Sequence, residues 1–187
     1  RITPLLKRFR QSILAAATSG RLTEDWRISG IAPETTDNIL WSIPSNWQWT
    51  PAENICAFIT KGTTPSKSAM TANQGEIPYI KVYNLTFDGA LDFTIEPTFI
   101  PRAVHETDLK RSRCLPGDVL MNIVGPPLGK VSVVPHGYSE WNINQAIARF
   151  RPAGVQSAYL SICLRNPSLI SHAVSRAKAT AGQFNLT

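Results

Sequence analysis

The sequence LLKRFRQSILAAATSGRLTEDWR, at residues 5–27, decides the overall organisation of the chain. Apolar side chains recur in it every three or four residues, at Leu6, Phe9, Ile13 and Ala16. This spacing is typical of a narrow apolar stripe along one face of a helix, and such a stripe suits pairing with one other helix. The stretch therefore predicts a protruding spacer helix that presents these four side chains to a partner helix.

The residues at both ends of this stretch are helix signals. Thr3 stands directly before Pro4, and threonine is a good N-cap while proline fits the first helical position. At the other end, Gly20 readily adopts the left-handed conformation that stops a helix. We therefore expect one helix that has Thr3 as its cap and ends before Arg21.

The positive charge is concentrated in the same region. Residues 1–27 carry six basic and two acidic side chains, a net charge of +4, whereas the other 160 residues carry thirteen and eleven, a net charge of +2. A protein that coats nucleic acid without specificity shows a denser excess than this. Charge alone therefore leaves both local nucleic-acid binding and simple solubility open.

The composition predicts one globular, intracellular domain with an appended helix. At 187 residues, 43% of them hydrophobic, the chain can bury one core. Its cysteines, Cys56, Cys114 and Cys163, are far apart and form no CxxC pair, which predicts reduced thiols rather than disulfides or a zinc site. No apolar run approaches the roughly 20 residues that span a bilayer, so we expect a cytoplasmic protein without membrane contact.

The order of the expected elements indicates the fold class. Residues 28–46 mix Pro, Ser, Thr and Asn without periodicity and predict a linker, so the domain is expected at 47–187. A long polar loop at 60–75 precedes strand-like runs at 77–85, 118–124, 130–134 and 144–150. Helices are expected at 103–113, 157–164 and 168–177, the last with Asn166 as its cap. Strands first and helices last predict an α+β fold with a small mixed or antiparallel sheet.

Motifs for catalysis are incomplete. The loop at 125–128, GPPL, lacks the amide and the aromatic ring with which amino-methyltransferases hold adenine. Asp108 and Lys110 fit half of a metal-dependent nuclease motif, but no Pro-Asp pair precedes them at a suitable distance. Metal-ligand spacing is also absent among the histidines, which are His105, His136 and His172. We expect a noncatalytic chain, with a site-specific endonuclease that uses Asp108 and Lys110 as the enzymatic alternative.

Segments spread over nearly the whole chain resemble, in the same order, the specificity (S) subunits of type I restriction-modification enzymes. They are the stretch at 5–27, Trp47 and Trp49, KGTTPSK at 61–67, IPYIKVYNL at 77–85, LPGDVLMNIVGPPLGKVSVV at 115–134, NINQAIARFRP at 142–152 and AGQFNLT at 181–187. The resemblance implies that 1–27 is the end of the central conserved spacer helix. It also implies that 28–46 is a linker and that 47–187 is the second target recognition domain.

The resemblance further implies a function and a set of partners. The domain is expected to read one half of a bipartite double-stranded DNA target, while the other recognition domain of the same subunit reads the other half and a second conserved helix pairs with the first. Modification (methyltransferase) subunits that use S-adenosylmethionine, and a restriction subunit that uses ATP and Mg²⁺, are expected to carry out the reactions. The chain itself is expected to bind no cofactor. A fused restriction-modification polypeptide with its own Mg²⁺-dependent cleavage site is the alternative.

Direct reading of DNA requires long donors and amides, because arginine or lysine pairs with guanine, and asparagine or glutamine with adenine. Candidates in the polar loop are Lys61, Thr63, Thr64, Ser66, Lys67, Asn73 and Gln74. Candidates elsewhere are Lys81, Tyr83, Asn84, Lys130, Asn142, Asn144, Gln145 and Arg149. A plain surface loop, a half-exposed strand face, or buried amides that satisfy loop carbonyls would account for the same residues.

Overall fold

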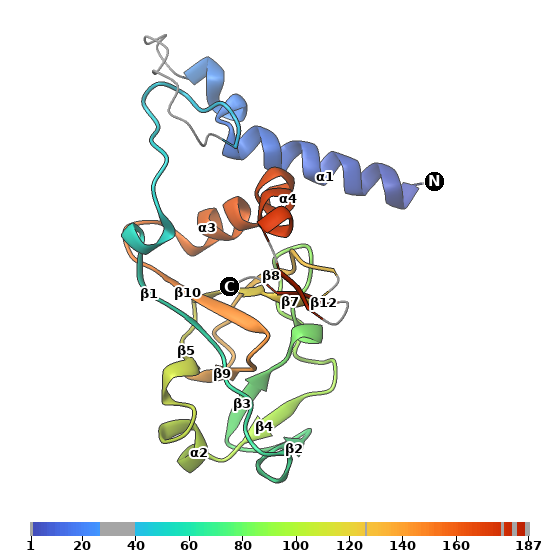
Figure 1. The fold of residues 1–187 in the computed structure, drawn as a ribbon, viewed down its shortest axis with the longest axis vertical. Helices are drawn as coiled ribbons and strands as arrows, with labels where there is room; N and C mark the ends of the chain where they lie inside the picture. Colours follow the sequence, from blue (N-terminus) through green and yellow to red (C-terminus); the bar gives the residue numbers. More distant parts are fainter. Residues whose placement is uncertain (1, 27–39, 126, 177, 181–182, 186–187) are drawn as a thin grey trace.

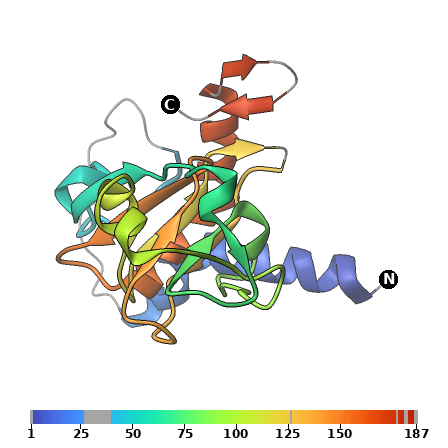
Figure 2. The same ribbon diagram turned by 90° about the horizontal axis from the view of Figure 1, so that it is seen from below.

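The computed structural model describes residues 2–26, 40–125, 127–176, 178–180 and 183–185 (Figure 1). Most of the predicted linker, residues 28–39, lies outside the described residues. At the N-terminal end, α1 spans Ile2–Thr18, and its first turns extend beyond the rest of the fold (Figure 2). The protruding helix is confirmed.

The two ends of α1 differ in how well the sequence predicted them. Thr3 lies inside the first turn of the helix, so its predicted role as the cap is wrong. Proline at the next position is tolerated because the first four N–H groups of a helix have no intrahelical acceptor. Gly20 has φ +78°, and the chain continues into the 3₁₀ turn η1 (Arg21–Trp26). The predicted glycine stop is therefore confirmed.

A four-stranded antiparallel sheet forms the upper half of the domain, against the helices. Its strands, in spatial order, are β1 (Cys56–Lys61), β10 (Ile147–Pro152), β6 (Val119–Asn122) and β8 (Val131–Val133). Helix α3 (Ser157–Leu164) packs on one face of this sheet, where Leu160 and Leu164 meet Val119 and Met121. The helix has the predicted bounds.

A five-stranded mixed sheet forms the other half. Its strands, in spatial order, are β2 (Thr71–Ala72), β4 (Thr98–Ile100), β3 (Ile77–Ile80), β9 (Trp141–Ile143) and β5 (Arg113–Cys114). Only the β3–β9 pair is parallel among these. Together with the antiparallel sheet and the late helices, this arrangement confirms the α+β class.

Strand β3 differs from the half-buried strand that was predicted at 77–85. It ends at Ile80, and all four of its side chains are buried. Tyr79 packs in a cluster with Ile100 and Leu109, whereas Ile80 packs on the opposite side with Leu120 and other residues. Because both faces of the strand are covered, alternation along it does not mark a solvent side.

The remaining elements are short. A three-stranded sheet consists of β7 (Val124–Gly125), β12 (Gln183–Asn185) and β11 (Lys178–Thr180). In place of the helix predicted at 103–113 are α2 (Arg102–Glu106) and the 3₁₀ turn η5 (Lys110–Ser112). Other 3₁₀ turns are η2 (Ala52–Asn54), η3 (Lys67–Ala69) and η4 (Val82–Asn84).

Asn166 links α1 to the helices at the end of the chain. The Oδ1 atom of Asn166 accepts a hydrogen bond from the Ser168 N–H at 2.8 Å and so caps α4 (Pro167–Arg176), as predicted. Its Nδ2 atom donates to Oγ1 of Thr18 in α1 at 2.5 Å. The Trp41 indole donates to the carbonyl oxygen of Thr18 at 3.1 Å. Asn166 therefore caps one helix while it holds another.

Replacement of Asn166 by alanine is expected to lower the free energy of unfolding by about 1–2 kcal/mol, because the cap and the bond to Thr18 are lost together. Gln156→Ala is the matched control, since Gln156 precedes α3 without a side-chain capping bond. Urea denaturation of both variants measures the difference. Equal stabilities of the two variants would contradict the dual role of Asn166.

Candidate nucleic-acid interface

Backbone hydrogen bonds bring three separate loops together at one place. The Gly62 N–H donates to the carbonyl oxygen of Ile147 at 2.9 Å, and the Thr63 N–H donates to that of Ile143 at 3.2 Å. The Asn144 N–H donates to the carbonyl oxygen of Ile80 at 3.1 Å. The ends of β1, β3 and β9 and the start of β10 therefore meet at the same edge of the domain.

Gly62 makes this close approach possible. A Cβ atom at this position would lie 2.1 Å from the carbonyl oxygen of Asn144 and 2.4 Å from that of Ile143. Both distances are far shorter than any real carbon–oxygen contact, and both neighbours are backbone atoms. Only glycine lets the loop after β1 lie directly on the turn between β9 and β10.

Seven of the predicted site residues gather around this meeting point, and we call them the loop patch. They are Lys61, Thr63, Lys81, Tyr83, Lys130, Asn144 and Gln145, and all are exposed or half-buried. The Lys130 ammonium donates to the carbonyl oxygen of Val82 at 3.4 Å, and the Lys81 ammonium lies 5.7 Å from the centre of the Tyr83 ring. The patch therefore combines three positive charges with an aromatic ring, two hydroxyls and two amides.

The two amides of the loop patch differ in accessibility. Gln145 is exposed. Asn144 is half-buried, and its Oδ1 atom is buried without a hydrogen-bond partner among the described residues. Gln145 is therefore the amide that a ligand reaches most easily.

The rest of the polar loop leads away from the patch. Ser66 and Lys67 are exposed at the start of the 3₁₀ turn η3. Thr64 interacts with the hydroxyl of Tyr79, and burial raises the pKa of this tyrosine to about 12. Asn73 has φ +65° and, like Gln74, is exposed beside β2, near the lower end of the domain in Figure 1. The Asn73 N–H donates to the carbonyl oxygen of Pro97 at 2.8 Å, and β4 separates β2 from β3, so these residues lie about 10 Å from β3 at about 4.8 Å per strand spacing. The structure does not place these five residues in the loop patch.

Asn84 has an internal role instead of a place in the interface. Its Oδ1 atom accepts from the Lys81 N–H at 2.9 Å, and its Nδ2 atom donates to the carbonyl oxygens of Asp92 and Ile95 at 3.0 and 2.8 Å. The side chain is buried. The prediction that Asn84 contacts DNA is corrected, because its donors and acceptors already hold the loop that follows η4.

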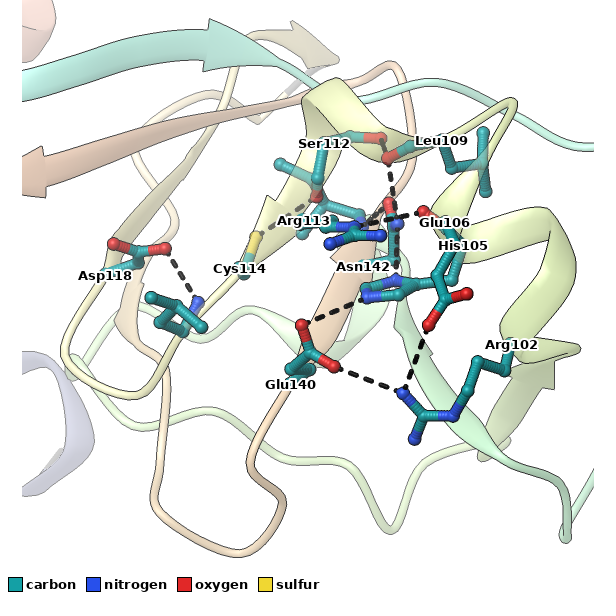
Figure 3. Close-up of polar contacts among 12 residues, drawn as sticks. Arg102, His105, Glu106, Leu109, Ser112, Arg113, Cys114, Asp118, Glu140 and Asn142 are labelled. Atoms are coloured by element: carbon teal, nitrogen blue, oxygen red, sulfur yellow. Dashed lines mark hydrogen bonds and ion pairs between the residues drawn. The ribbon is translucent and has the colours of Figure 1, made fainter.

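Asn142 is likewise buried, in the polar network that Figure 3 shows. Its Nδ2 atom lies 3.0 Å from Nδ1 of His105 and donates to the carbonyl oxygen of Leu109 at 3.1 Å, while Oδ1 accepts from the Ile143 N–H. Nδ1 of His105 is then an acceptor, so the ring proton sits on Nε2, which faces Oε1 of Glu140 at 3.6 Å. The prediction that Asn142 contacts DNA is corrected, because its amide joins α2 and η5 to β9.

Burial governs the protonation of His105 in this network. Desolvation lowers the pKa of this histidine, Glu140 opposes the effect, and the charges of Arg113 and Arg102 add to it. The neutral ring that results is the form that accepts a hydrogen bond from Asn142. The histidine therefore acts as a structural support.

Arg149 is the last of the predicted readers, and it lies outside the loop patch. It is paired across the sheet with Thr60, and only 3% of the residue is exposed. Its guanidinium lines a groove between the β1–β10 edge of the sheet and residues 110–115. Arg111 and Arg113 line the same groove and were not among the predicted site residues, although the basic run KRSR at 110–113 marks them in the sequence.

The predicted partner face of α1 is largely open. Leu6, Phe9 and Ile13 are exposed, and Ala16 is half-buried near the junction with the domain. An exposed apolar stripe of this kind is typical of a surface that another helix covers. The pairing itself stays a prediction.

Two enzymatic expectations can be compared with the structure. Among the described residues, no three His, Cys, Asp or Glu side chains lie close enough to hold a metal ion. Asp108, on the turn before η5, and Lys110, the first residue of η5, are both exposed, so the nuclease alternative gains no support. All three cysteines are free thiols, and two of them, Cys56 and Cys114, are buried. None of the described helices has the length and apolar character needed to cross a membrane.

Comparison with known proteins identifies the family. The type I restriction enzyme EcoBI specificity subunit of Escherichia coli is 30% identical over 191 residues, which cover 96% of this chain and 37% of that protein. The chain belongs to the family of type I restriction specificity subunits. It spans well under half the length of the EcoBI subunit. The EcoDI specificity subunit of the same organism is 32% identical over 75 residues, 34% of this chain and 17% of that subunit. No family model matches the chain.

Solved structures of specificity subunits share the fold. The HsdS subunit from Thermoanaerobacter tengcongensis superposes with a TM-score of 0.56 at 17% identity, over 98% of this chain and 42% of that one. A chain from a structure described as showing complex assembly and conformational transition of the type I restriction-modification system gives a TM-score of 0.55 at 18% identity, over 89% and 38%. At these identities the likeness concerns the fold.

Proposed function

We propose that this chain recognises DNA within a type I restriction-modification system, that it reads one half of a bipartite target, and that it performs no catalysis. Its relatives are named specificity subunits. The observation that carries the proposal is the convergence of Lys61, Lys81 and Gln145 from three loops on one edge of the domain, which is fixed by backbone hydrogen bonds. A domain that reads DNA needs cations that contact phosphates and, beside them, an amide that can pair with a base.

Each kind of side chain in the loop patch has its own task in this proposal. The ammonium groups of Lys61, Lys81 and Lys130 contact phosphates and set the register of the domain on the duplex. The amide of Gln145 pairs with the N6 and N7 atoms of an adenine in the major groove. Tyr83 supplies a ring and a hydroxyl beside these groups.

The remaining parts of the proposed function belong to partners. The second conserved helix of the subunit covers the apolar stripe of α1, whose 17 residues contribute about 26 Å to the distance between the two half-sites. Modification subunits methylate with S-adenosylmethionine, and a restriction subunit cleaves with ATP and Mg²⁺. The chain itself directs these subunits and binds none of their cofactors.

An exchange experiment tests the function. Residues 47–187 are replaced by the corresponding domain of a relative within the full-length specificity subunit, which is expressed with its modification subunits, and the methylated adenines of the host genome are mapped. We expect one half of the modified sequence to change while the other half stays the same. An unchanged methylation pattern would contradict DNA recognition by this domain.

A second arm of that experiment tests the loop patch. Gln145→Ala is expected to reduce the preference for one base pair by about tenfold, since a bidentate amide–adenine pair is worth about 1–3 kcal/mol. Gln156→Ala is the matched control, because Gln156 is exposed outside the patch. If Gln145→Ala, Lys61→Ala and Lys81→Ala all leave the methylation pattern intact, the domain reads DNA with another surface.

A further inference from the structure

A groove of about 610 Å³ lies beside the loop patch and is lined by five cationic side chains. They are Lys110, Arg111, Arg113, Arg149 and Arg151, and we call this site the arginine groove. Its other charged lining residue is Glu140. Arg113 and Glu140 are both drawn in Figure 3, next to the His105 network that supports this wall.

The carboxylates near the groove neutralise only part of this charge. Asp118 accepts two hydrogen bonds of 2.8 Å from the Arg151 guanidinium and another of 2.8 Å from the Leu115 N–H. Glu140 is shared with Arg102, at 3.3 Å, outside the groove. Five cations against these two carboxylates leave an excess of three positive charges around one concave site.

Arg149 is the least satisfied of these cations. Its Nε atom is buried without a hydrogen-bond partner among the described residues, and the nearest carboxylate oxygen, Oδ2 of Asp118, is 4.0 Å away. The guanidinium stacks 4.7 Å above the ring of Phe58. Burial lowers the pKa of Arg149, but a guanidinium stays protonated in proteins. A buried charge of this kind is unfavourable unless an anion lies close to it, and the 4.0 Å contact with Asp118 compensates it only in part.

The geometry selects the kind of anion. Planar guanidinium groups that converge on a concave site match the oxygens of a phosphate, which accepts several charge-assisted hydrogen bonds at once. Phe58, at the groove, and Lys61, in the loop patch, lie three residues apart on β1, about 10 Å along the strand at about 3.3 Å per residue, with their side chains on opposite faces. A spacing of this size along β1 is within the length of a short duplex segment, since successive base pairs lie about 3.4 Å apart.

We propose that the arginine groove binds a backbone phosphate of the same DNA duplex that the loop patch reads. This inference rests on the proposed function and adds an anchoring site to it. A phosphate in the groove places negative charge beside the Arg149 guanidinium and offsets the excess positive charge. The groove carries no base-reading amide in its lining, so it contributes affinity and register for every sequence.

Salt-dependent binding of a short random-sequence duplex tests the proposal with the whole chain. Fluorescence anisotropy at increasing KCl gives the negative slope of log affinity against log salt, whose magnitude decreases by about 0.9 for each phosphate contact that is lost. Arg111→Ala, which removes an exposed lining residue, and Arg149→Met, which keeps the side-chain volume, are expected to flatten the slope by about 0.9 each. Arg176→Ala, at the exposed end of α4, is the control and is expected to leave the slope unchanged.

Three results would overturn the proposal, and they differ in what they say about the function. Unchanged slopes for both groove variants, with flatter slopes for Lys61→Ala and Lys81→Ala, would refute the groove and leave DNA recognition standing. Unchanged slopes together with binding of polyglutamate that Arg111→Ala abolishes would assign the groove to an acidic protein partner. A wild-type chain without salt-dependent DNA binding would refute both proposals.

Discussion

The Asp118→Ala variant is expected to lose about 3–5 kcal/mol of unfolding free energy, because removal of one partner leaves buried positive charge uncompensated. Asp118 is 2% exposed and is bonded by the Arg151 guanidinium through both carboxylate oxygens. It is also the nearest carboxylate to the buried Arg149. Loss of Asp118 additionally leaves the Leu115 N–H without its acceptor.

A surface ion pair provides the control for this expectation. Glu106 lies 3.7 Å from Arg102, and about half of each side chain is exposed. Glu106→Ala is therefore expected to cost less than about 1 kcal/mol. Thermal and urea denaturation of both variants give the comparison. An Asp118→Ala loss as small as that of Glu106→Ala would show that the buried Arg149 and the half-buried Arg151 do not depend on this carboxylate.

Gly62→Ala is expected to destabilise the protein by about 1–3 kcal/mol, the usual cost of forcing an extra carbon into a packed site. The new Cβ atom meets two backbone carbonyls, those of Asn144 and Ile143, and neither can turn away as a flexible side chain would. Relief of the overlap requires the loop after β1 to move away from the turn before β10. The same change is therefore expected to weaken DNA binding by the loop patch.

Gly137→Ala is the matched control for Gly62→Ala, because a Cβ atom at Gly137 would meet nothing within 4 Å. Urea denaturation reports the stability of both variants, and duplex anisotropy reports their affinity for DNA. If Gly62→Ala matched Gly137→Ala in both measurements, the contact between the two loops would be unnecessary for folding and for the site.

Elements with local signals were predictable from the sequence. The stop at Gly20, the cap at Asn166 and the bounds of α3 all follow from residues within one turn of the feature. The extent of β3 was not predictable in this way, because contacts from distant segments bury both of its faces. The short α2 and η5 in place of one helix have the same cause: the buried His105 and Asn142 bind each other across 37 residues of sequence.

The sequence predicted the kinds of residues in the candidate site, but it did not show which individual residues are accessible. Residues such as Lys61, Lys81 and Gln145 are of the right types, and the structure brings them to one edge. The same reasoning selected Asn84 and Asn142, whose amides are enclosed by carbonyls from distant loops, and the type of a residue carries no information about such enclosure. Arg111 and Arg113 were missed because the groove exists only once β10 lies beside residues 110–115.

The hydrogen bond from Asn166 to Thr18 bears on how precisely α1 can fix the distance between two DNA half-sites. A helix can set the distance between two half-sites only if its junction with the domain is rigid. One base pair occupies about 3.4 Å along the duplex. A displacement of the domain by that amount relative to α1 would let the loop patch bind one base pair away from its target. The Asn166 amide is bonded to Thr18 of α1 through Nδ2 and to the Ser168 N–H of α4 through Oδ1. A displacement of this size between α1 and the domain therefore requires the bond between Asn166 and Thr18 to break. The precision of the proposed spacing therefore depends on the bonds that Asn166 and Trp41 make to Thr18, outside the loop patch.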